Sequence, residues 1–115
     1  MQIPDVASVP PLAGPHEIFD LPGNSTREFT VTKYVLGRMT ITPRETKIPK
    51  EIVALRVWVP NDDKPLYPDY WDVTAQTLIP QLVPPLDAAQ GEPVRFRVTK
   101  FGSGPTARFQ VAANA

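Results

Sequence analysis

Two segments near the C-terminus alternate apolar and polar residues. In 93–101, PVRFRVTKF, residues 94, 96 and 98 are apolar and residues 95, 97 and 99 are polar, and 106–112, TARFQVA, repeats the pattern with apolar residues at 107, 109 and 111. Because successive side chains of a β-strand point to opposite faces, this alternation predicts two strands that each bury one face. The linking residues 102–105, GSGP, are typical of a turn, so we predict a β-hairpin.

Two further segments predict strands earlier in the chain. Residues 28–42, EFTVTKYVLGRMTIT, are rich in β-branched and aromatic side chains, which favour strands, and Gly37 stands where a bend is expected. We therefore predict one long strand that bends at Gly37. A basic loop over 43–49 follows, and residues 51–59, EIVALRVWV, predict a second strand that ends at Pro60.

One short helix is expected between the second and the third predicted strand. Asp69 can cap a helix that begins at Tyr70, and Pro80 should kink or end it near Ile79. Four apolar residues share one helical stripe, the pattern of a helix packed on a core: Trp71, Ala75, Leu78 and Leu82.

Proline use separates an N-terminal segment from the rest of the chain. The 115 residues include 15 prolines, more than twice the ordinary share of about 5%. Residues 1–26 contain five of them and show no helical or alternating period, so we predict an extended Pro-rich arm. This arm is either a floppy terminus or a segment that lies on its own domain or on a neighbouring subunit. Residues 27–115 are expected to form a single β-rich domain.

The charges are sorted along the chain, although their sum is zero. Residues 1–26 hold three acids and no base, and 27–59 hold seven bases against three acids. Residues 60–92 hold one lysine against six acids, and 93–115 hold four bases and no acid. The two basic blocks coincide with the predicted strands. An acidic arm that folds over a basic strand face is one hypothesis that this sorting suggests.

The residue types argue against catalysis. There is no cysteine, His16 is the only histidine, and no nucleophile stands in a recognisable setting, so we expect neither an enzyme, a cofactor nor a metal site. The acidic loop before the predicted helix lacks the spacing of a calcium loop. No run of about 18 apolar residues occurs, so we expect a soluble protein without membrane contact, in the cytoplasm or in a virion if the protein is viral.

Cationic and aromatic residues share the strand faces opposite the predicted core. Cations neutralise a phosphate backbone and rings stack on bases, a combination that suits single-stranded DNA or RNA without strong sequence preference. The alternative is a plain solvated sheet face, with Trp58 covering the helix or the arm. The candidate residues are Arg56, Trp58, Arg95, Arg97, Phe101 and Arg108, with Lys33 and Arg38 as neighbours.

The predicted order of elements resembles an oligonucleotide-binding (OB) fold, a small barrel whose first long strand bends. The closing segment FRVTKFGSGPTARFQV also resembles the last hairpin of bacteriophage single-stranded-DNA-binding proteins. The resemblance implies an OB-like barrel or a strongly bent sheet that binds single strands. Those proteins tend to carry an acidic C-terminal tail, whereas this sequence ends in AANA, which puts recruitment of partners by a tail in doubt.

A structural role is the second function that the sequence favours. The Pro-rich arm would then contact neighbouring subunits of a larger assembly, such as a virion, or of a homo-oligomer.

Overall fold

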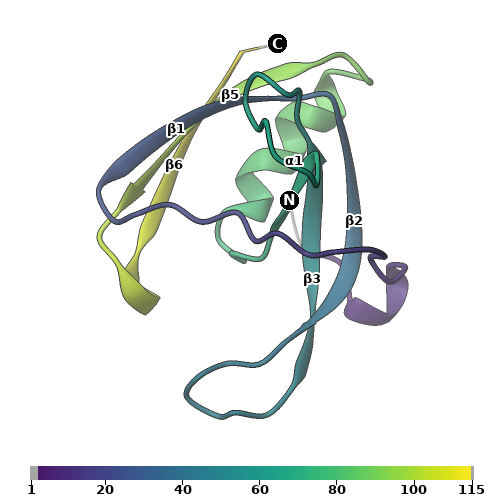
Figure 1. Ribbon diagram of the computed structural model, residues 1–115, viewed down its shortest axis with the longest axis vertical. Coiled ribbons are helices and arrows are strands. Elements are labelled where there is room, and N and C mark those ends of the chain that lie inside the picture. Colours follow the sequence, from purple (N-terminus) through teal and green to yellow (C-terminus); the bar gives the residue numbers. More distant parts are fainter. Residues whose placement is uncertain (1–2, 115) are drawn as a thin grey trace.

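The computed structural model describes residues 3–114, apart from the side chain of Pro105, and within them it contains six strands and one α-helix (Figure 1). The strands are β1 (Ser25–Val31), β2 (Lys33–Ile41), β3 (Lys50–Trp58), β4 (Tyr70–Val73), β5 (Val94–Phe101) and β6 (Arg108–Asn114). The helix is α1 (Ile79–Ala88), and two 3-10 turns cover Val6–Ser8 and Gly104–Thr106.

The strands form two antiparallel sheets, β1-β5-β6 and β2-β3-β4. Only Thr32 separates β1 from β2, so one long stretch of chain leaves the first sheet and enters the second. The predicted bend at Gly37 is therefore wrong, because the direction changes at Thr32 and Gly37 lies inside β2. The predicted C-terminal hairpin is confirmed, with Phe101 opposite Arg108. Within residues 3–114 no strand pair joins β4 to β6, so the strands do not close a barrel.

The prediction of a helix from Tyr70 is wrong. Residues Tyr70–Val73 form β4, which pairs with β3 and is buried throughout. The helix begins only at Ile79, and Pro80 stands in its first turn, where the missing N–H would have no partner in the helix. Pairing with β3 thus decides the conformation of 70–73. The four-residue spacing from Trp71 to Ala75 does not distinguish a helix from a strand, because residues four apart share a face in both.

The main core lies between the inner faces of the two sheets and the helix. Three aromatic rings form its centre: the centroid of Phe29 lies 5.5 Å from Trp71, and Phe19 lies 5.2 Å from Phe29 and 5.3 Å from Trp71. The helix closes one end of this core. It buries Ile79, Leu82, Val83 and Leu86.

The N-terminal segment crosses the outer face of the β2-β3-β4 sheet from one edge to the other (Figure 1). At β2, Leu12 N donates to Arg38 O, and Arg38 N donates to Pro10 O, both at 2.9 Å. At β4, Phe19 N donates to Asp72 O at 3.0 Å. The segment is therefore hydrogen-bonded to both edges of this sheet within its own domain.

The same segment also contributes to the main core and contacts a side chain of the other sheet. Phe19 and Leu21 are buried and belong to the main core. Lys100 Nζ of β5 donates to Leu21 O at 3.1 Å. Residues 17–21 thus run alongside β4 and are also bound by Lys100 of the other sheet.

Gly37 permits this crossing, because a side chain there would meet the arm. A Cβ at position 37 would lie 2.6 Å from Leu12 Cγ and 2.9 Å from Pro10 O. We expect Gly37→Ala to lower the free energy of unfolding by about 1–3 kcal/mol, the usual range for overpacking, measured by urea denaturation. Thr40→Ala, at an exposed position of the same strand, is the control. Equal stability of the two variants would contradict the close approach of arm and strand.

Candidate nucleic-acid interface

The structure divides the eight predicted site residues between two sheets. The outer face of β1-β5-β6 carries Arg95, Arg97, Phe101 and Arg108. The β2-β3-β4 sheet carries Lys33, Arg38, Arg56 and Trp58. The residues therefore do not form the single continuous face that alternation in each strand suggested.

Arg56 is buried, with 6% of its surface exposed. Its Nε lies 2.7 Å from Asp72 Oδ1, and its Nη2 lies 3.0 Å from Asp72 Oδ2. The remaining Nη1 donates to Ala13 O of the arm at 2.6 Å. The hydrogen bonds to Asp72 raise the pKa of Arg56 above its ordinary value, although burial opposes this effect. Arg56 is thus a cation that is fully engaged inside the protein.

Asp72 is the centre of this network and was missed by the sequence analysis. Its side chain is fully buried, and Oδ2 lies 2.7 Å from His16 Nδ1 of the arm. The neighbouring Tyr70 places its ring 4.0 Å from the Arg56 guanidinium and donates its hydroxyl to Pro15 O at 2.7 Å. A strand at 70–73 would have been the signal, because it puts Asp72 directly opposite Arg56.

Arg38 also binds the arm. Its Nη1 donates to Val9 O at 2.6 Å, and its Nε lies 3.4 Å from Glu51 Oε2. The arm therefore does fold over two of the predicted cations, but it meets them with the carbonyl oxygens of Val9 and Ala13 rather than with acidic side chains.

Lys33 and Trp58 lie opposite each other where β2 begins and β3 ends. Lys33 Nζ lies 4.8 Å from the ring of Trp58, whose other neighbour is Tyr70 at 5.7 Å between ring centroids. Trp58 is half-buried in this stack. The ring is thus already in contact with a cation and a second ring.

The outer face of β1-β5-β6 is open. Arg97, Arg108 and Phe101 are exposed, and Phe101 and Arg108 are direct cross-strand neighbours. Arg95 Nη1 lies 3.1 Å from Asp63 Oδ1, whereas within residues 3–114 no ion pair involves Arg97 or Arg108. Glu28 stands across from Arg97 on β1.

A shallow hollow of about 240 Å³ lies between β5 and β6 on this face. It is lined by Arg97 together with the polar side chains of Thr99 and Gln110 and by Ala112. A cation and two neutral hydrogen-bonding groups thus border one depression, which is a chemically suitable environment for a phosphate or sugar oxygen.

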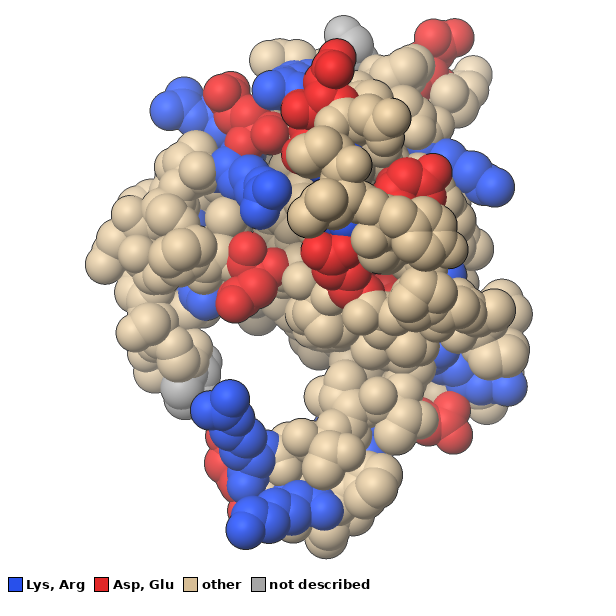
Figure 2. Space-filling view, in the orientation of Figure 1, with Lys and Arg blue, Asp and Glu red and all other residues tan. Residues whose placement is uncertain are grey.

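The face crossed by the arm carries charges of both signs. Figure 2 shows Asp and Glu side chains interspersed with Lys and Arg over the arm and its surroundings. Lys and Arg gather at the tip of the β2–β3 loop, across an open hollow from the β5–β6 end (Figure 2), and Arg44 and Lys47 of this loop are exposed. The arm-covered face therefore offers no continuous basic surface.

The buried Arg56–Asp72 pair predicts that the stability losses caused by substitutions at these two positions are not additive. Asp72→Asn should cost about 3–5 kcal/mol, because it leaves the Arg56 cation buried without its counter-charge. Arg56→Met likewise leaves the Asp72 carboxylate buried without its counter-charge. The double variant should therefore lose less stability than the sum of the two single losses. Chemical denaturation measures this cycle.

Arg95→Met is the matched control, because that arginine is also paired with an aspartate but 45% of its side chain is exposed. Its loss should not exceed about 1 kcal/mol. Additive losses in the Arg56 and Asp72 cycle would contradict the pairing.

The part of the chain that the structure describes contains no group of three His, Asp or Glu side chains arranged as metal ligands, and none of its helices is long and apolar enough to span a membrane.

No known protein family, no curated protein and no solved structure matches this chain significantly.

Proposed function

We propose that this chain binds single-stranded nucleic acid, with little sequence preference, on the outer face of the β1-β5-β6 sheet. The observation that carries this proposal is the open group formed by Arg97, Arg108 and Phe101. Two exposed guanidinium groups without an ion pair within residues 3–114 share a strand face with an exposed aromatic ring. Guanidinium groups bind phosphates, and a ring on the same surface can stack on a base.

Each residue of this face has a distinct role in the proposal. Arg97 and Arg108 neutralise backbone phosphates, and Phe101, with 48% of its surface exposed, stacks on a base. Arg95 contributes less, since Asp63 already binds it. The other four candidates, Lys33, Arg38, Arg56 and Trp58, take part in structural contacts instead.

The strand pairing supports an OB-like architecture. A continuous strand shared by two sheets, a helix before the last two strands and a closing hairpin are the features of that partly open barrel. OB folds bind oligonucleotides on the face of their second and third strands, which correspond to β3 and β4 here. Because the arm occupies that face, we place the interface on the other sheet.

A role in a larger assembly is the second candidate. It is favoured by Leu66 and Tyr67, two large side chains that are 76% and 80% exposed in the loop between β3 and β4. The arm itself lies on its own domain, so the contact with a neighbour would use this loop. Sedimentation of the full chain and of a Leu66→Ser/Tyr67→Ser variant tests this role. If the chain assembles through this loop, the full chain sediments as an oligomer and the variant as a smaller species.

Binding of a fluorescein-labelled oligo-dT, followed by anisotropy at about 50 mM salt, tests the proposal, since low salt favours such complexes. Arg97→Ala and Arg108→Ala should each weaken binding and reduce the slope of log K against log salt by about 0.7. Phe101→Leu should weaken binding while leaving this slope unchanged, because it removes the ring and no charge. Glu28→Gln should strengthen binding.

The matched control is Arg27→Ala, which removes an arginine from the opposite face of the same sheet. Arg27 lies 4.5 Å from the ring of Trp71 and should not affect the oligonucleotide. Undetectable binding at low salt, or equal effects of Arg27→Ala and Arg97→Ala, would contradict the proposed interface.

A further inference from the structure

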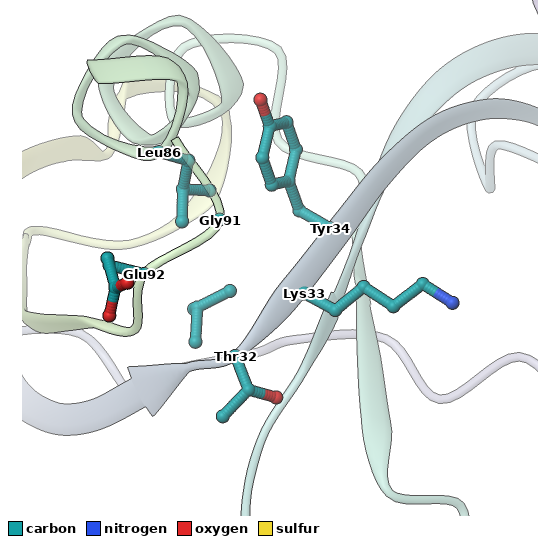
Figure 3. A pocket seen from close by; sticks show the side chains of 7 residues that line it. Thr32, Lys33, Tyr34, Leu86, Gly91 and Glu92 are labelled. Carbon is teal, nitrogen blue, oxygen red and sulfur yellow. The ribbon is translucent and has the colours of Figure 1, made fainter. Parts of the chain in front are cut away.

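A pocket of about 350 Å³ lies between the junction of β1 and β2 and the C-terminal end of α1 (Figure 3). Val31 is fully buried behind the pocket, and the accessible apolar lining comes from the half-buried ring of Tyr34 and a small part of Leu86. Gly91 leaves one side open, because a Cβ built there would meet no atom within 4 Å. The volume is at the lower end of the range of ligand pockets, so the pocket suits a small molecule.

Tyr34 holds its wall of the pocket in place. Its hydroxyl donates to the Asp87 carboxylate on α1. This hydrogen bond, with burial as a smaller cause, raises the pKa of Tyr34 above its ordinary value. Tyr34 therefore stays neutral at physiological pH and ties β2 to the helix, so the apolar wall is preformed.

The border of the pocket carries one carboxylate, that of Glu92. Glu92 lines the pocket and is exposed, and within residues 3–114 no ion pair involves it. Asp87 does not line the pocket, and its carboxylate accepts the hydrogen bond of Tyr34. Lys33 also borders the pocket, but its side chain extends away from it (Figure 3) and its Nζ lies 4.8 Å from the ring of Trp58. An apolar interior with an acidic border is complementary to an organic cation.

We propose that this pocket binds a small organic ammonium compound, whose apolar body packs on the ring of Tyr34 and the exposed edge of Leu86 and whose cation lies beside Glu92. The site is separate from the proposed nucleic-acid interface, and its acidic border disfavours phosphate. The two proposals therefore stand or fall independently.

Three probes of matched size test this site by NMR titration of the full chain: 2-phenylethylammonium, the neutral 2-phenylethanol and the anionic 3-phenylpropanoate. We expect the ammonium probe to shift the amide signals of Thr32, Gly91 and Glu92 with saturation at about 1–10 mM, which is typical of so small a ligand. Glu92→Gln should weaken its binding about two- to fivefold, the effect of losing one exposed charge pair.

The charge-reversing Glu92→Lys variant is the stricter test, because it should reject the ammonium probe and favour 3-phenylpropanoate. A general loss of structure would weaken both probes and could not produce this exchange. Equal binding of the three probes, shifts confined to other parts of the protein, no binding at 10 mM, or an unchanged preference in Glu92→Lys would each overturn the proposal.

Discussion

The buried ion pair between Arg56 and Asp72 fixes the relation between the N-terminal arm and the sheet beneath it. Two charges removed from water are tolerated only when each has hydrogen-bonding partners, and here the partners come from both the sheet and the arm. Asp72 binds Arg56 with both carboxylate oxygens and also contacts His16, while Arg56 uses its remaining Nη1 to bind Ala13 O. The arm thus completes a network that the sheet alone would leave unsatisfied.

The arm has a second structural role at the free edge of β4. Exposed strand edges are sites of unwanted pairing between chains, and proteins cover them. Residues 17–19 hydrogen-bond to the edge of β4, and the ring of Phe19 packs against both Phe29 and Trp71 in the core. The Pro-rich composition suits this task, because an extended chain without regular periodicity can follow two edges and a core in succession. The arm is therefore part of the domain, and its position directs the proposed binding to the opposite sheet.

The sequence predicted those features that depend on neighbouring residues. Alternation and a glycine-containing turn located the β5–β6 hairpin, and the face that carries Arg97, Phe101 and Arg108 followed from it. The errors arose where distant segments decide the structure. Residues 70–73 form a strand only because β3 is available for pairing, and Asp72 becomes a buried partner only through that register. In the same way, the alternation of apolar and polar residues places Arg56 and Arg97 on the outer faces of their strands. It does not show that the two strands belong to different sheets.

Amide hydrogen exchange at Leu12 and Phe19 tests most directly whether the arm belongs to the folded domain. These two N–H groups bind Arg38 O and Asp72 O, one at each edge of the β2-β3-β4 sheet. The structure predicts that both exchange slowly, with protection comparable to that of the amides of β3. Opening the Phe19 amide disturbs the main core, and opening the Leu12 amide disturbs the contact of Leu12 with Met39, Ile52 and Ala54. Rapid exchange at Leu12 and Phe19, with β3 still protected, would show that the arm is not bound there and would contradict this account.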